Sequence, residues 1–244
     1  LNKIGLIEMG IPYYGWLIGI HTSVIRIALQ MKIPLIFYSE DGEVEYGGDM
    51  KHKDNGIYGI DYQISTYLES GYNKVISKAK AEGLTEKQLY WFTFPSKDEF
   101  DDLNIEITHY SFYENWDPYR NYLLAKELYG LKENPTLNEG TYTNYSMTDS
   151  ILFELHMYFM YLKFGFARAT SDAAIDVRRG AMSRDQAVEL VRLYDNIYPE
   201  KNFKQYCDYY KISMKEFLAN IDKWANKELF EKKKDRWVPK FKIS

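Results

Sequence analysis

Four acidic residues gather in a short segment that directly follows an apolar run. The run covers residues 34–38 of the stretch IPLIFYSEDGEVEYGGD, and the acids are Glu40, Asp41, Glu43 and Glu45. Carboxylates on such a loop can hold a hard cation such as Mg²⁺ together with phosphates and water, or one of them can act as a general base. A solvated acidic turn is the alternative. The flanking glycines and the position after a strand favour a functional site, with Glu45 solvated.

A second group of polar residues lies in the stretch GFARATSD, residues 165–172. A turn at Gly165 is expected to bring Arg168, Thr170 and Ser171 to the start of the helix DAAIDVRRG. Helix N–H groups, a guanidinium and hydroxyls together bind anions, so this segment suits phosphate groups. The alternative is an ordinary helix start, with Thr170 or Ser171 as N-cap and Asp172 placed favourably against the helix dipole.

Three further polar residues are expected on helices. His21 is expected at the beginning of the first helix, Arg26 on another face of that helix, and Arg178 near the end of the helix that follows Gly165. A histidine at a helix end is ordinarily bonded to backbone, and Arg178 is expected to pair with surface acids. A structural zinc site is not expected, because the histidines lack metal-like spacing and Cys207 is the one cysteine.

The amino-acid composition limits which classes of protein the chain can belong to. The chain has 244 residues, 45% of them hydrophobic, and a formal net charge of -4. It is long enough to bury a substantial core, and it has no global basic field to attract nucleic acid. We expect no membrane insertion, since no uninterrupted apolar run approaches about 18 residues. The single cysteine excludes an intrachain disulfide and suits a cytoplasmic location.

Helix and strand patterns alternate in the first part of the chain. A helical pattern over residues 16–32 leads into the strand 34–38, and a second strand is expected in LNIEITHYSFY. Asp117 and Pro118 suit the start of the next helix and Gly130 its end. Thr85 with Gln88 makes a capping-box pattern. We therefore expect an α/β fold with a parallel sheet, covered on both faces where IPLIFY runs.

The second part of the chain is expected to be almost entirely helical. Three amphipathic segments begin at capping signals: Asp149 or Ser150 for the first, Ser183 for the second and Ser213 for the third. The turn-rich stretch NPTLNEGTYTN suggests the division between the parts. We accordingly expect an α/β domain over residues 1–134 and a helical substrate or partner region over residues 135–244.

Several motifs resemble known families. SEDGEVEYGGD resembles the second conserved segment of the asparagine-synthetase-type ATP pyrophosphatases, roughly G-E-G-x-D-E-x-x-G-G-Y. IHTSVIRIALQMKIPLIFYSEDGEVEYGG, NWDPYRNYLLAKELYGL, KFGFARATSDAAIDVRRGAMSRDQAVELV and RWVPKFKI, in this order, resemble the N-acetyl sugar amidotransferases of bacterial surface-polysaccharide (lipopolysaccharide O-antigen) biosynthesis. The likeness covers nearly the whole chain. It implies a partial Rossmann-like sheet of the adenine nucleotide alpha hydrolase type, followed by a mainly helical region.

The resemblance also implies an activity. A sugar or sugar nucleotide would have its N-acetyl group converted to an acetamidino group, using ATP, Mg²⁺ and ammonia from a glutaminase subunit, with a cyclase-like ammonia-conducting subunit as a further partner. Glu40 would orient or deprotonate ammonia, and Glu43, with Asp41 as substitute, would bind Mg²⁺. The other implied contacts are Ser39, Gly42, Gly47, Gly48, Arg168, Thr170 and Ser171 for ATP, and His21, Arg26 and Arg178 for the sugar.

One motif of the pyrophosphatases does not occur in this sequence. Their first ATP-binding segment, the glycine-rich S-G-G-x-D-S loop, cradles the pyrophosphate end of ATP with its backbone N–H groups. We therefore expect the chain to be the C-terminal part of such an enzyme or a degenerate relative. Two other functions remain open: a non-catalytic module that binds a sugar nucleotide or a partner, and a glycosyltransferase whose acidic loop holds a metal-bound diphosphate.

Overall fold

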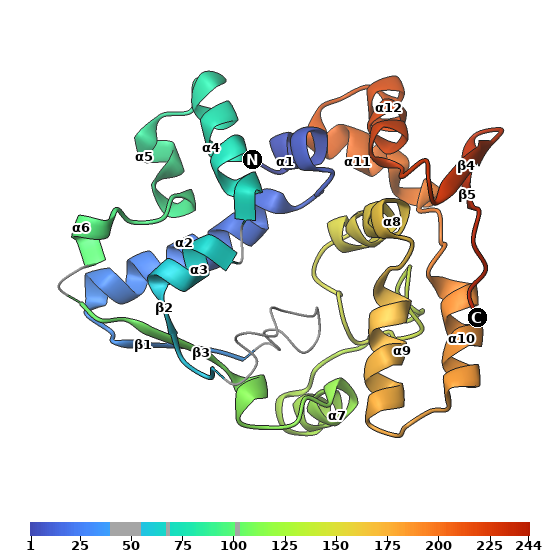
Figure 1. Ribbon diagram of the computed structural model, residues 1–244, viewed down its shortest axis with the longest axis horizontal. Helices are drawn as coiled ribbons and strands as arrows, with labels where there is room; N and C mark the ends of the chain where they lie inside the picture. Colours follow the sequence, from blue (N-terminus) through green and yellow to red (C-terminus); the bar gives the residue numbers. More distant parts are fainter. Residues whose placement is uncertain (40–54, 67–68, 101–102) are drawn as a thin grey trace. The chain divides into compact units, whose positions relative to one another are not determined.

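The computed structural model describes residues 1–39, 55–66, 69–100 and 103–244 (Figure 1). The fold is mixed α/β and mostly helical, with small sheets and with 57% of the described residues in helices. Two compact units make up the chain. The first consists of Leu1–Met9 and Tyr13–Trp116, and the second of Gly10–Pro12 and Asp117–Ser244. The domain boundary expected near residue 134 was inferred from a turn-rich stretch of sequence and not from how compactly the residues pack. It stays a prediction.

A three-stranded sheet organises the first unit. Its strands are β1 (Leu35–Tyr38), β2 (Tyr58–Gly59) and β3 (Glu106–His109), in the order β1-β3-β2. The two predicted strands, β1 and β3, run parallel, with Tyr38 opposite His109, whereas β2 pairs antiparallel with β3. The two predicted strands are thus parallel as expected, and β2 adds an antiparallel strand that makes the sheet mixed.

The prediction that β1 is covered on both faces was wrong. Ile36 is buried, but Leu35 and Phe37 are 47% and 52% exposed. Among the described strands β1 lies at an edge of the sheet. Its alternate side chains therefore face the core and the solvent in turn.

Helix α2 (Tyr14–Met31) supports this sheet and confirms the helix expected over residues 16–32. Its residues Ile18, Thr22 and Ile25 are fully buried at a spacing of four and three, as one face of a helix requires. The core combines Ile25 and Ala28 of α2 with Ile36 and Ile107 of the sheet. The unit's other helices are α1 (Asn2–Met9), α3 (Ile60–Thr66), α4 (Glu69–Ala81), α5 (Glu86–Leu89), η1 (Tyr90–Phe92), α6 (Lys97–Phe100) and η2 (Tyr110–Phe112).

The second unit is helical with a short hairpin. Its elements are α7 (Pro118–Tyr129), α8 (Leu152–Phe164), α9 (Arg168–Arg178), α10 (Arg184–Tyr194), η3 (Glu200–Asn202), α11 (Phe203–Tyr210), α12 (Met214–Trp224), β4 (Phe230–Lys233) and β5 (Arg236–Pro239). The predicted caps Asp117, Ser183 and Ser213 and the stops Gly130 and Gly165 are confirmed. For α8 the N-cap by position is Ile151, one residue after the predicted Ser150, but the Ser150 hydroxyl accepts the backbone N–H of Leu152 at 3.2 Å, so Ser150 caps the first turn as expected.

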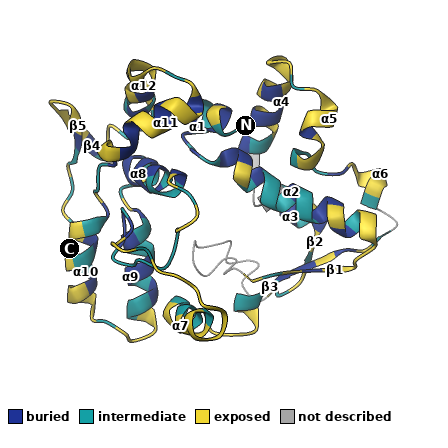
Figure 2. Ribbon diagram, turned by 180° about the vertical axis from the view of Figure 1, so that it is seen from behind, coloured by how far each residue is buried: buried dark blue, intermediate teal, exposed yellow. Residues whose placement is uncertain are grey.

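The aromatic residues of the second unit mainly fill its core. Figure 2 shows α8 as largely buried, and Phe159 and Tyr161 on this helix are 0% and 1% exposed. Tyr206 and Tyr210 of α11 are equally buried, and Tyr210 donates its hydroxyl to the carbonyl of Pro12 at 2.6 Å. A buried tyrosine needs such an acceptor. Within the part of the chain that the structure describes, no helix is both long and apolar enough to cross a lipid bilayer.

Candidate functional site

The carboxyl ends of β1 and β3 bring two histidines together with aromatic side chains. Tyr38 ends β1 and His109 ends β3, and their rings stack with centroids 5.2 Å apart. His21 of α2 approaches the other side of this group, with its ring centroid 6.1 Å from that of Tyr38. The Tyr58 hydroxyl of β2 lies 3.2 Å from His109 Nδ1. Ligands of α/β sheets commonly bind at such strand ends.

Gln63 of α3 completes what we call the His21–His109 cluster, which consists of His21, Tyr38, Tyr58, Gln63 and His109. The Gln63 side-chain amide is hydrogen-bonded through Nε2 to His21 Nδ1. Gln63 is 0% exposed, and its Oε1 atom is buried without a hydrogen-bond partner among the described residues. The cluster therefore contains a buried acceptor that requires a donor.

Both histidines of the cluster are held neutral. Burial lowers the pKa of His21 to about 4, and the neighbouring His109 lowers it further in the same direction. Burial likewise lowers the pKa of His109 to about 4. Desolvation disfavours the charged form of an imidazole. At neutral pH the cluster thus offers uncharged hydrogen-bonding groups.

These pKa values predict an acid-sensitive first unit. Each histidine has a folded-state pKa below the ordinary histidine value of 6.5, so below about pH 6.5 the unfolded chain binds more protons than the folded one. Stability is therefore expected to fall as the pH drops from 6.5 towards 4. Urea unfolding at about pH 7 and about pH 5 measures this change. The double variant His21→Asn/His109→Asn should show a smaller pH dependence, and an unchanged dependence would contradict the assignment.

The predicted catalytic loop begins immediately beyond this cluster. Ser39 is exposed and directly follows β1. The other loop residues proposed for catalysis, metal binding and ATP contacts lie outside the described residues, namely Glu40, Asp41, Gly42, Glu43, Glu45, Gly47 and Gly48. Their roles stay predictions. In the described part of the chain, no group of three or more His, Cys, Asp or Glu side chains could hold a metal ion.

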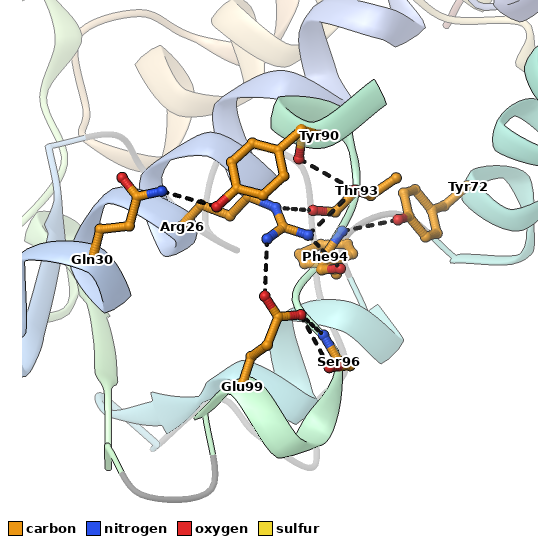
Figure 3. Close-up of polar contacts among 8 residues, drawn as sticks. All are labelled: Arg26, Gln30, Tyr72, Tyr90, Thr93, Phe94, Ser96 and Glu99. Carbon is orange, nitrogen blue, oxygen red and sulfur yellow. Dashed lines mark hydrogen bonds and ion pairs between the residues drawn. The ribbon is translucent and has the colours of Figure 1, made fainter. Parts of the chain in front are cut away.

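Arg26 has a structural environment that explains its presence without a substrate (Figure 3). Its guanidinium donates to the carbonyl oxygens of Thr93 at 2.7 Å and Phe94 at 3.1 Å, and it lies 3.3 Å from a Glu99 carboxylate oxygen. The Tyr90 ring covers it, with the ring centroid 4.2 Å from Cζ. The side chain is only 7% exposed. This geometry favours the structural alternative over the expected sugar contact.

His21 differs from expectation in its position. It lies in the second turn of α2, which begins at Tyr14 and is preceded by α1, so the expected position at the start of the first helix was wrong. Its side chain nonetheless belongs to the cluster at the strand ends. The substrate role proposed for it stays a prediction.

The start of α9 is occupied by a carboxylate of the protein itself. Asp195, 2% exposed, accepts hydrogen bonds from the backbone N–H groups of Ala167 at 2.9 Å and Thr170 at 3.1 Å and from the Thr170 hydroxyl at 2.5 Å. The N-cap is Ala167, so Thr170 and Ser171 lie inside the helix and the prediction of either as N-cap was wrong. Because Asp195 uses these donors, the structure favours an organising role over phosphate binding.

The arginines near α9 are divided between ion pairs and solvent. Arg168 Nε donates to Asp172 Oδ1 at 2.8 Å, and Asp172 also accepts from the buried Thr141 hydroxyl at 2.5 Å. Burial raises the pKa of Asp172, while Arg168 acts in the opposite direction. Arg179 joins Asp117 and Asp176, as expected of an arginine paired with acids. Arg178 is exposed, and its proposed sugar contact stays a prediction.

The cluster contains residues that the sequence pattern did not single out. His109 directly ends a predicted strand, which was a usable signal, because it corresponds in the parallel pair to Tyr38, at the end of β1. Gln63 is one polar residue in the helical stretch IDYQIST, and nothing in its spacing distinguishes it. Its place beside His21 depends on how α3 and α2 pack, because the two residues are 42 positions apart in the chain.

One comparison with known proteins bears on the second unit. Residues 139–242 match a family model. That model describes the C-terminal domain of WbpG-like lipopolysaccharide biosynthesis proteins. The matched region contains α8 to α12 and both strands of the hairpin, and it includes Arg168, Asp172 and Asp195. A search of curated proteins finds no match to the chain. The second unit is thus similar to a domain of lipopolysaccharide biosynthesis proteins.

Proposed function

We propose that the chain serves in an ATP-dependent amidotransferase of lipopolysaccharide biosynthesis, which converts a sugar N-acetyl group to an acetamidino group. A glutaminase partner, together with a cyclase-like ammonia-conducting subunit, would deliver the ammonia. The observation that carries the proposal is the match of residues 139–242 to the WbpG-like C-terminal domain. The motifs of the first unit supply the chemistry. In this proposal the parallel pair β1–β3 belongs to a Rossmann-like nucleotide-binding sheet.

The proposed reaction has to make an amide oxygen leave. Bound ATP supplies the leaving group, because the amide oxygen departs as part of AMP after pyrophosphate has been released. Ammonia forms the new C–N bond, and splitting the reaction in this way divides one difficult displacement into two easier ones. The ligand chemistry of Asp41 and Glu43 fits Mg²⁺, which prefers carboxylate and phosphate oxygens. Glu40 would orient or deprotonate ammonia.

The geometry of the first unit supports this division of roles. The acidic segment leaves β1 directly after Tyr38 and Ser39, and Tyr38 stacks on His109. An ammonia-consuming site benefits from uncharged neighbours, since a protonated amine has no lone pair with which to attack. The buried neutral imidazoles of His21 and His109 provide such neighbours.

The test is an assay of the complete native protein with Mg-ATP, an ammonium salt and a diacetamido sugar nucleotide. The expected products are AMP, pyrophosphate and a sugar lighter by about 1 Da, because NH replaces an oxygen atom. Sugar binding without consumption of ATP would overturn the proposal in favour of a binding module. Sugar transfer without consumption of ATP would overturn it in favour of a glycosyltransferase.

A further inference from the structure

The unpartnered Gln63 oxygen points to a small ligand within the His21–His109 cluster. Gln63 is completely buried, and its Oε1 atom has no hydrogen-bond donor in the described part of the chain. A buried acceptor left without a donor costs about 1–3 kcal/mol. If the amide turned around, Oε1 would accept from a protonated His21 Nδ1 and Nε2 would become the buried atom without a partner, so one amide atom lacks a partner in either orientation. A molecule that donates a hydrogen bond to Oε1 would remove this cost.

The surroundings of Gln63 restrict the chemistry of that molecule. Among the described residues, the cluster around it consists of the imidazoles of His21 and His109 and the phenols of Tyr38 and Tyr58. These groups are polar and aromatic, and none of them is cationic at neutral pH. With no cationic group in the cluster, the surroundings suit a small neutral donor better than an anion.

We infer that the Gln63 carbonyl, beside His21, binds the ammonia that the proposed reaction consumes. This inference rests on the proposed function, which requires ammonia close to the carboxyl ends of β1 and β3. Ammonia has three N–H groups, so it can donate to Oε1 and still retain its lone pair for attack. Water satisfies the same acceptor, and the experiment must distinguish the two.

The test compares Gln63→Leu with the complete native protein in two assays. In ammonium-dependent amidination, the apparent KM for ammonium should rise about 10- to 100-fold, as expected for the loss of one buried hydrogen bond. The KM values for ATP and for the sugar nucleotide should stay unchanged. Gln30→Leu is the matched control, because this exposed amide on α2 donates to the Tyr90 hydroxyl and is not part of the His21–His109 cluster.

The second assay does not depend on catalysis. The imidazole ¹⁵N and ¹H resonances of His21 and His109 are followed by NMR during titration with ammonium chloride, with sodium chloride at matched ionic strength as the reference. A saturable ammonium-specific shift in the native protein and in Gln30→Leu, lost in Gln63→Leu, supports the inference. Shifts that are absent, or equal with both salts, mean that water occupies the acceptor and overturn it. A specific shift in a protein that never forms AMP would overturn the proposed function and leave ammonia binding standing.

Discussion

Replacing Arg26 with alanine is expected to destabilise the first unit by about 3–5 kcal/mol, because the change removes one partner of a buried charged network. The guanidinium bonds two backbone carbonyls, those of Thr93 and Phe94, and is covered by the Tyr90 ring. Alanine leaves both carbonyls without this donor and opens a cavity beneath the ring. The contact ties α2 to the segment after η1, so the loss should affect the whole unit.

Two variants separate the parts of this network. Arg26→Lys keeps the charge but cannot reach all of the acceptors from one ammonium group, so an intermediate loss is expected. Glu99→Gln should cost less than about 1 kcal/mol, since the Glu99 side chain is 48% exposed and exposed ion pairs contribute little.

Urea unfolding, with hydrogen-exchange mass spectrometry of α2 peptides, measures the changes in stability and assigns them to the first unit. If Arg26 contacted the substrate instead, Arg26→Ala would lower sugar binding with little change in stability. That outcome would contradict the structural role.

The parts of the fold that the sequence predicted are those determined by neighbouring residues. Thr85, Ser183 and Ser213 each bond a backbone N–H three positions later and form capping boxes, so a short stretch contains the whole signal. Asp117 and Pro118 likewise mark the start of α7 through neighbouring residues alone. The strands at 35–38 and 106–109 were likewise visible as apolar runs next to turn-forming residues.

The start of α9 and the C-terminal hairpin depend on distant residues. Asp195 caps α9 from 25 residues further along the chain, which no local pattern reveals. The stretch KKKDRWVPKFK is basic, yet β4 and β5 pair there. Trp237 is 9% exposed and donates to Asp222 at 3.0 Å. These elements form because tertiary contacts override local composition.

The sequence pattern indicated where a candidate site lies but not which residues form it. The loop predicted at the end of an apolar strand pointed to the edge of the sheet where Tyr38 and His109 meet. Gln63 and Tyr58 join them only because α3 and the short β2 return to that edge. The acids of residues 40–54 remain predicted from sequence, and the structure adds the neutral cluster beside the start of their loop.

Asp195→Ala is expected to cost the second unit about 3 kcal/mol, the sum of several buried hydrogen bonds and one lost helix cap. The carboxylate accepts from Ala167 N–H, Thr170 N–H and the Thr170 hydroxyl, and Ala167 is 0% exposed. Without Asp195 these donors face a space that offers no acceptor. Burial raises the pKa of Asp195, whereas the hydrogen bonds lower it, so the carboxylate is held in place by the donors it satisfies.

Two milder variants make the test specific. Thr170→Val removes one hydrogen bond while keeping the shape, with an expected loss of about 1 kcal/mol. Asp195→Asn places an amide N–H₂ against N–H and O–H donors, so its cost should fall between the other two. Hydrogen exchange of α9 in urea measures all three losses.

The same variants decide between the two roles considered for the start of α9. If this helix end binds phosphate and Asp195 merely substitutes for the ligand, removing the carboxylate should tighten the binding of ATP or of a sugar nucleotide. If Asp195 organises the helix, Asp195→Ala should weaken folding without improving either affinity. We expect the second result, because Arg168, the one guanidinium at this helix start, is already engaged by Asp172. A gain in phosphate affinity in Asp195→Ala would return the start of α9 to the binding site.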